Sequence, residues 1–277
     1  MLTPNRCSIN TATLGYKEPV ERVIEKVARH GFSAIAPWRR EIEGGDVSAI
    51  ARQIRDAGLA VSGYCRSSPI PAETTATRDA RHEENRRALA DAATLGAACF
   101  VIVAGGLAAG SRDLPDARLQ VEDGLARLLD EARALGVTLA IEPLHPMYAA
   151  DRCCVNTLAQ ALDICARLDP DGRGGIGVAL DAYHVWWDPD LAAGIERAGR
   201  ERRMAAFHIC DWLVPTADLL MDRGMMGEGV IDLPAINRAV VATGFTGYRE
   251  IEIFSTRWWS VDSETTLHEC AKRVLSI

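Results

Sequence analysis

Short apolar runs alternate along the chain with longer stretches in which apolar residues recur every three or four positions. The short runs have the length of buried β-strands, and the longer stretches have the spacing of amphipathic helices. Strands are predicted at residues 6–10, 33–37, 59–64, 97–104, 137–142, 176–181, 205–208 and 248–253. Helices are predicted to follow them at residues 18–30, 46–57, 78–95, 117–135, 157–168, 189–198, 233–243 and 262–275, several closed by a glycine.

This alternation predicts an α/β fold with parallel strands, because a helix between two strands returns the chain to the same edge of the sheet. Eight such units close into a (β/α)8 TIM barrel, and the 277 residues suit one single domain that spans residues 1–277. A doubly wound open sheet is the competing fold, but the number of units favours the barrel. In a barrel, the side chains at the carboxyl ends of the strands form the active site.

Four predicted strands, the fifth to the eighth, end on side chains that bind metal ions: Glu142, Asp181, His208 and Glu252. Each residue alone has a simpler explanation. It can be a solvent-facing carboxylate, a helix cap, or a histidine whose hydrogen bonds are satisfied at the rim of the barrel. Together they offer hard oxygen ligands with one imidazole and no thiolate, which suits Mn²⁺, Mg²⁺ or Co²⁺ better than structural zinc. We predict one divalent metal ion there, with Mn²⁺ favoured. Glu250 shares a strand face with Glu252, so either can reach the site.

Four motifs resemble those of the xylose isomerase-like TIM-barrel superfamily, in its sugar isomerase/epimerase branch of ketose 3-epimerases and inosose-processing enzymes. They lie at residues 141–146 (IEPLHP), 180–184 (LDAYH), 207–211 (FHICD) and 250–253 (EIEI). The resemblance implies that Glu142, Asp181, His208 and Glu252 hold the metal. It also implies that the two glutamates are catalytic, flanking the substrate carbon and exchanging its proton.

The same resemblance implies three further substrate-binding positions. His184 stands three residues after the aspartate, as the family's substrate-binding histidine does, and Arg223 matches a family arginine after the seventh strand. His145 stands where the family often has asparagine or another polar residue, and this departure bears on which sugar is bound.

All six tryptophans lie just beyond predicted strand ends, at positions 38, 186, 187, 212, 258 and 259. Because aromatic faces stack on sugars, Trp212 and Trp186 are predicted substrate contacts; packing at the barrel rim or between subunits is the alternative. The segment 215–231 carries Arg223 among several glycines and can act as a lid. A solvated arginine in a mobile loop is the alternative for Arg223.

The predicted site points to proton transfer beside a carbonyl. A metal ion polarises the carbonyl and stabilises the enediolate that forms when a carboxylate removes the α-proton. Return of the proton to the opposite face gives an epimer, return to the neighbouring carbon gives an isomer, and loss of a β-substituent makes the protein a lyase or dehydratase. No phosphate-binding loop follows Gly105, Gly106 and Gly110, which favours a free or oxidised sugar over a sugar phosphate.

The composition of the chain limits the classes of binding partner and the cellular compartment that we expect. The net charge of −7 disfavours nucleic acid, no apolar stretch is long enough to span a membrane, and the N-terminus lacks a signal-peptide pattern. Eight scattered cysteines without a CxxC pair indicate reduced thiols in the cytoplasm. We therefore expect a small sugar or keto-polyol as substrate and no membrane partner. A homo-oligomer, dimer or tetramer, is expected from the resemblance.

Two other functions are less well supported. A DNA-repair endonuclease of the same superfamily needs extra histidines on early strands, but strands two to four end in Pro37-Trp38, Tyr64-Cys65 and Ala104-Gly105. A non-catalytic sugar-binding subunit is disfavoured because both glutamates and the histidine are present.

Overall fold

Eight parallel strands form a ring in the computed structural model, which describes residues 2–277. They are β1 (Cys7–Asn10), β2 (Ala34–Ala36), β3 (Ala60–Val61), β4 (Cys99–Ile102), β5 (Thr138–Ile141), β6 (Ile176–Asp181), β7 (Met204–Ile209) and β10 (Arg249–Ile251). Their order is β3-β2-β1-β10-β7-β6-β5-β4, and parallel bridges from Val61 to Ala97 and from Tyr64 to Phe100 join the first strand to the last. The predicted TIM barrel is confirmed, and the open sheet is excluded.

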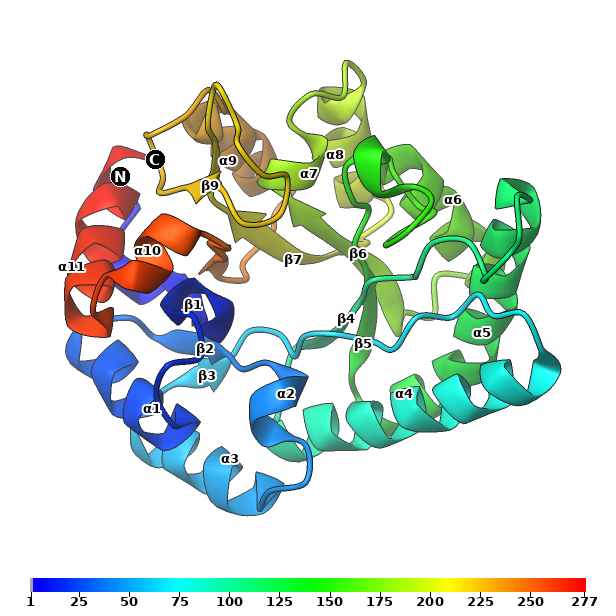
Figure 1. Cartoon of the computed structure of the whole chain (residues 1–277), viewed down its shortest axis with the longest axis horizontal. Coiled ribbons are helices and arrows are strands. Elements are labelled where there is room, and N and C mark those ends of the chain that lie inside the picture. Colours follow the sequence, from blue (N-terminus) through cyan, green and yellow to red (C-terminus); the bar gives the residue numbers. More distant parts are fainter. Residues whose placement is uncertain (1) are drawn as a thin grey trace.

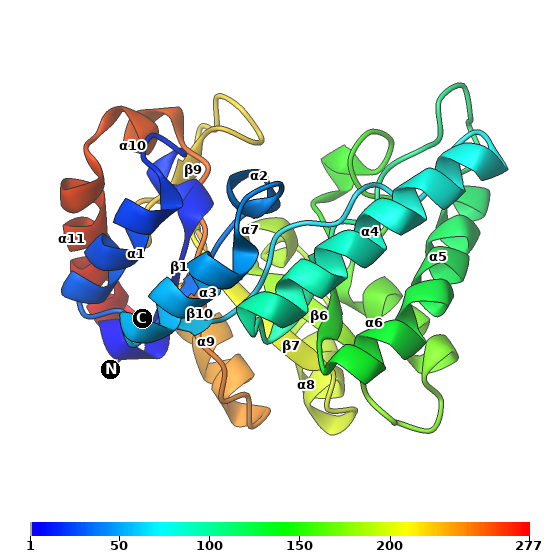
Figure 2. The same cartoon turned by 90° about the horizontal axis from the view of Figure 1, so that it is seen from below.

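Helices surround the strands on the outside of the ring (Figure 1). The eight that connect or follow strands are α1 (Val20–Arg29), α3 (Val47–Asp56), α4 (Thr75–Leu95), α5 (Leu114–Leu135), α6 (Leu158–Leu168), α8 (Leu191–Arg200), α9 (Leu233–Ala242) and α11 (Ser263–Arg273). The two longest, α4 and α5, run side by side along one wall (Figure 2). Both begin three residues before the prediction, because Thr74 and Asp113 cap them by accepting a backbone N–H.

Seven short elements were not predicted, and they lie in the segments that follow the carboxyl ends of strands. They are η2 (Thr11–Leu14), α2 (Arg39–Ile42), η3 (Pro146–Tyr148), α7 (Ala182–Val185), β8 (Asp211–Trp212), which pairs with β9 (Arg223–Gly224), and α10 (Thr256–Ser260). One turn of helix is too short to show a period in sequence. These elements build up the barrel face on which the predicted ligands lie. Two further 3₁₀ turns, η1 (Pro4–Arg6) and η4 (Val274–Ser276), lie near the chain ends.

Burial follows the barrel geometry. Small side chains fill the inside of the ring, among them Val101, Ala140, Ala179 and Ala206, while a larger apolar core lies between strands and helices. All eight cysteines are buried and unpaired. None of the helices within residues 2–277 is long and apolar enough to cross a lipid bilayer.

A buried ion pair ties α6 to the start of β7. The Asp169 carboxylate, 1% exposed, contacts the guanidinium of Arg203 and lies 2.7 Å from Nη2 of Arg133. Two backbone amides, of Arg173 and Gly174, also donate to it. Burial raises the pKa of Asp169, but Arg203 and these amides outweigh it and hold that pKa below its usual value.

Asp169→Asn is expected to lower the free energy of unfolding by about 3–5 kcal/mol, because Arg203 stays buried without its counter-charge. Since the folded state depresses the pKa of Asp169, its contribution is present above the unfolded pKa of ~3.9 and is lost as the pH falls below it. The difference between the variant and the wild type therefore shrinks in acid. Urea unfolding at pH 7 and pH 3.5 tests this, with the exposed Asp171→Asn as control; a loss under about 1 kcal/mol at pH 7 contradicts it.

Candidate metal centre and substrate cavity

The four predicted ligands converge at the carboxyl ends of adjacent strands. Asp181 is the last residue of β6 and lies beside His208 of β7, while Glu142 and Glu252 directly follow β5 and β10. All four are buried, with exposed fractions of 0–5%. One donor atom from each lies within 4.8 Å of the others. The barrel thus brings together residues that are up to 110 positions apart, from Glu142 to Glu252.

The contacts within this cluster fit a metal ion. Glu142 Oε1 lies 2.9 Å from His208 Nδ1, within ion-pair distance, although neither atom has a hydrogen-bond partner of good geometry. Two ligands on adjacent corners of an octahedral site with ~2.1 Å bonds lie about 3 Å apart. Glu252 Oε2 lies 4.0 Å from the same nitrogen. Unpaired donor atoms at this spacing are what a divalent cation requires.

Glu250 supports His208 from the other side of the imidazole. Its Oε1 lies 3.5 Å from His208 Nε2, and its side chain accepts hydrogen bonds from Asn10 Nδ2 (2.8 Å) and Ser62 Oγ (2.7 Å). Burial lowers the pKa of His208, but the nearby glutamates, Glu250 first, outweigh it and hold that pKa well above its usual value. Of the two glutamates on this strand, Glu252 joins the cluster and Glu250 lies behind the histidine, whose Nε2 forms no hydrogen bond to it.

Asn10, at the end of β1, fixes both glutamates. Its Nδ2 donates to Glu250 Oε1 and to Glu252 Oε1 (3.0 Å), which leaves Glu252 Oε2 facing the cluster. Its Oδ1 accepts from Trp38 Nε1 (2.7 Å), so the amide orientation is fixed as well. The sequence prediction missed Asn10, although it ends its strand as the four ligands end theirs.

Arg223 is buried beside the cluster. Its Nη1 lies 2.9 Å from Asp181 Oδ2 and 3.1 Å from Glu252 Oε2, and its Nη2 lies 3.1 Å from His184 Nε2. With an exposed fraction of 3%, it is not a solvated arginine. Burial raises the pKa of Asp181, but Arg223, the two neighbouring histidines and the backbone N–H of Tyr183 together outweigh it and hold that pKa below its usual value. Burial also lowers the pKa of His184 to about 3, so its imidazole is neutral at pH 7.

A cavity of about 250 Å³ opens above the ligands Glu142 and Glu252. Its aromatic walls come from Tyr16, Trp38, Tyr148, Phe254 and Trp259. Leu220 and Met221, from the segment predicted as a lid, form another part of its wall together with Arg223. The cavity therefore combines apolar faces with converging polar groups, as small-molecule sites do.

The sequence model of a family described as xylose isomerase-like TIM barrel matches residues 24–273. The chain belongs to this family. A protein from Sinorhizobium meliloti 1021, known from its crystal structure, is 50% identical, with 98% of each chain covered and a TM-score of 0.94.

Two curated relatives have named activities. An inosose isomerase from Bacillus subtilis (strain 168) is 27% identical over 162 residues, 56% of this chain and 54% of that protein. The matched region therefore spans about half the length of that relative. An L-ribulose 3-epimerase from Mesorhizobium japonicum is 27% identical over 246 residues, 86% of this chain and 76% of that protein.

The fold is shared more widely. The IOLI protein, whose crystal structure contains a zinc atom, is 20% identical over 98% of this chain and 97% of that one, with a TM-score of 0.82. At this identity the likeness concerns the fold alone.

The remaining predicted substrate contacts of this xylose isomerase-like barrel lie in one aromatic cluster. The His145 ring stacks on Trp212 at 5.1 Å, and Trp212 also packs against Tyr183 (4.7 Å) and Trp186 (5.7 Å). The cavity lining contains His184, Arg223 and two other tryptophans, Trp38 and Trp259, but none of His145, Trp186 and Trp212. All six tryptophans follow strand ends, so the sequence alone could not distinguish those that line the cavity from those that do not.

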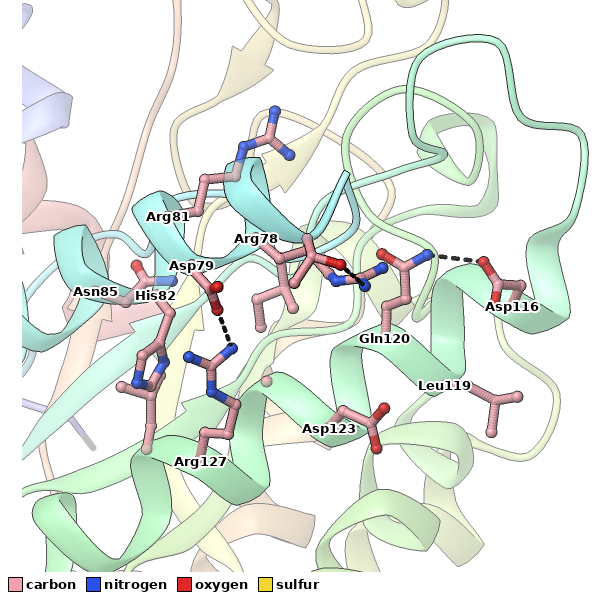
Figure 3. A pocket seen from close by; sticks show the side chains of 14 residues that line it. Arg78, Asp79, Arg81, His82, Asn85, Asp116, Leu119, Gln120, Asp123 and Arg127 are labelled. Carbon is pink, nitrogen blue, oxygen red and sulfur yellow. Dashed lines mark hydrogen bonds and ion pairs between the residues drawn. The ribbon is translucent and has the colours of Figure 1, made fainter. Parts of the chain in front are cut away.

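A larger cavity, of about 490 Å³, lies on the outside of the barrel between α4 and α5 (Figure 3). It contains one ion pair, in which Asp79 lies 2.9 Å from Arg127, and Gln120 donates to Asp116 at 2.7 Å. Within residues 2–277, the one group of side chains that could hold a metal ion lies beside the smaller cavity.

Asn10→Ala is expected to weaken divalent-metal binding by about 10- to 100-fold, because Glu250 and Glu252 both lose the amide that orients them. Calorimetric titration of the metal-stripped protein with Mn²⁺ measures this, and Asn5→Ala, exposed before the same strand, is the matched control. Equal affinities for Asn10→Ala and the wild type would show that Asn10 does not position the ligands.

Proposed function

We propose that this protein is a divalent-metal-dependent sugar isomerase or epimerase that moves a proton next to the carbonyl of a ketose or keto-polyol. The observation that carries the proposal is the buried cluster of Glu142, Asp181, His208 and Glu252, in which Glu142 and His208 have unpaired donor atoms and Glu142 and Glu252 line an aromatic-walled cavity. The names of the two curated relatives, an inosose isomerase and an L-ribulose 3-epimerase, support the same class of reaction.

The four residues of the cluster hold the metal ion in this proposal, and Mn²⁺ is the favoured ion, with Mg²⁺ and Co²⁺ as alternatives. Three carboxylates and one imidazole form a hard donor set that suits these ions. When bound, the ion polarises the substrate carbonyl and stabilises negative charge on its oxygen. Elemental analysis of the purified protein tests the choice of ion, and zinc is the competitor to measure because the IOLI structure contains it.

Glu142 and Glu252 act as the acid–base pair. They approach the cavity from opposite sides of the cluster, β5 and β10 being separated in the ring by β6 and β7. Burial, followed by repulsion from Glu142, raises the pKa of Glu252 to about 8 despite the nearby Arg223. A carboxylate held at the floor of the cavity is placed to take up and return the substrate proton. Asn10 holds the Glu252 carboxylate in place throughout.

His184 and Arg223 complete the proposed site by binding substrate oxygens. Both line the cavity, and the guanidinium of Arg223 lies over the rings of Tyr183 (4.4 Å) and Phe254 (5.1 Å), which restrict its movement. Arg223 presents N–H donors only, whereas the neutral His184 imidazole both donates and accepts hydrogen bonds.

Product analysis tests the proposal. Metal-loaded protein is incubated with ketohexoses, inososes and 3-keto glycosides, and the products are identified by NMR. A new epimer or isomer is the expected product. Loss of a β-substituent would instead place the protein among the lyases and dehydratases, and unchanged substrates throughout would refute both.

A further inference from the structure

Three arginines besides Arg223 line the substrate cavity: Arg40, Arg66 and Arg152. Within residues 2–277, none of their guanidinium groups forms a hydrogen bond or lies within 4.0 Å of a carboxylate. Arg40 lies over the Tyr16 ring (4.4 Å) and Arg152 over the Tyr148 ring (5.5 Å), contacts that leave the charge in place. Arg66 has no aromatic partner of this kind.

The charge of the cavity is unbalanced. Its only acidic lining residues are Glu142 and Glu252, which belong to the metal cluster, and Arg223 is already paired with Asp181 and Glu252. The excess positive charge is local, because the whole chain carries a net charge of −7. Some arginines on the outer surface are paired with carboxylates, as Arg86 is with Glu83 and Glu131, and Arg197 with Asp163 and Glu201.

Arg66 is the most informative of the three arginines, because it is partly removed from water and lacks a counter-charge among residues 2–277. It is half-buried, and burial, followed by repulsion from Arg152, lowers its pKa below the usual value. Leaving a partly desolvated guanidinium without a partner costs free energy, which an anion between Arg66 and Arg152 would recover. A planar guanidinium binds a carboxylate or phosphate through two parallel hydrogen bonds.

We propose that the substrate is an anionic keto sugar whose oxyanion, a carboxylate or phosphate, is bound by Arg66 and Arg152, with Arg40 at the more exposed edge. The carbonyl end of the sugar faces Glu142 and Glu252. This inference rests on the proposed function for the carbonyl end and adds a charge requirement at the other end. An uncharged sugar would leave the three guanidinium groups unpaired.

The test uses substrates that differ only at the terminal carbon: D-fructose, D-fructuronate and D-fructose 6-phosphate, and the corresponding D-tagatose series. Deuterium exchange in D₂O gives kcat/KM for each compound. We expect kcat/KM for the better anionic member to exceed that for the neutral ketose by about 10- to 100-fold, the range for a hydrogen bond between charged groups. Whether the carboxylate or the phosphate is preferred identifies the oxyanion.

Arg66→Gln and Arg152→Gln are expected to bring this ratio close to one, mainly through KM for the anionic substrate. The matched control is Arg52→Gln, exposed on α3, which should keep the wild-type ratio. A wild-type preference for the neutral ketose, or a ratio unchanged in Arg66→Gln, would overturn the inference and leave the isomerase proposal standing.

Calorimetric titration with D-fructuronate and D-fructose 6-phosphate separates the two proposals if no compound exchanges deuterium. The proposed function would then fail for these ketoses, and binding would decide the anion site alone. Binding of either anion that weakens about 10-fold or more in Arg66→Gln supports the inference. No binding, or equal binding by the variant, overturns it.

Discussion

Glu142→Gln and Glu252→Gln are each expected to lower the rate of substrate proton exchange by about 10²- to 10⁴-fold. Glutamine keeps the shape of the side chain but cannot accept the substrate proton at the working pH. Both residues are buried at the floor of the cavity, so neither can be replaced by a nearby solvent-exposed carboxylate. Deuterium incorporation followed by NMR measures the rate for each variant.

Metal content must be measured beside these rates, because both glutamates are also proposed ligands. A variant that retains the ion but loses exchange has lost the acid–base group, whereas one that loses both has lost a ligand. Glu21→Gln, exposed on α1, controls for the change in net charge. Rates near the wild-type value in either Glu142→Gln or Glu252→Gln would remove that glutamate from the acid–base role.

His208→Ala is expected to leave the purified protein without its metal ion, with affinity lowered by more than about 100-fold, the upper range for an outer-sphere partner. His208 supplies the only nitrogen donor of the cluster, and its Nδ1 lies closest to Glu142 Oε1, at 2.9 Å. Without the imidazole, the carboxylates of Glu142, Asp181 and Glu252 still repel one another, and the metal ion that offsets this repulsion is held by one ligand fewer. Elemental analysis and Mn²⁺ titration measure the loss.

Two controls keep this result interpretable. His268→Ala removes an exposed imidazole from α11 and should bind metal as the wild type does. Asp181→Asn removes the negative charge of a different ligand without opening a void, so it should also lose affinity even if His208→Ala folds poorly. Unchanged metal content in a folded His208→Ala protein would show that His208 is not a ligand.

The sequence was sufficient to predict the barrel because the pattern that indicates each strand or helix lies within one short segment of the chain. Each strand is a short apolar run, each outer helix has one apolar stripe, and their alternation determines the direction of the chain. The short elements α7 and α10 could not be predicted in this way. They are stabilised by a capping side chain, Asp181 or Ser255, and by packing at the barrel face.

The candidate ligands were predictable because each ends a strand, and a parallel barrel brings strand ends together. The residues that position them were not, because their role depends on register and on contacts between distant strands. Asn10 reaches Glu250 and Glu252 only because β1 pairs with β10. Arg66 follows a strand without any motif, and its unpaired charge is visible only beside Arg152 in the cavity.

One NMR experiment tests the central claim, metal-dependent proton transfer at this barrel face, most directly. Protein stripped with EDTA is compared in D₂O with the same protein reloaded with Mg²⁺, using neutral and anionic ketoses and inososes as substrates. The account predicts deuterium at one carbon beside the carbonyl, only in the reloaded sample and not in Glu142→Gln. Exchange that persists after metal removal, or no exchange with any substrate, would contradict it.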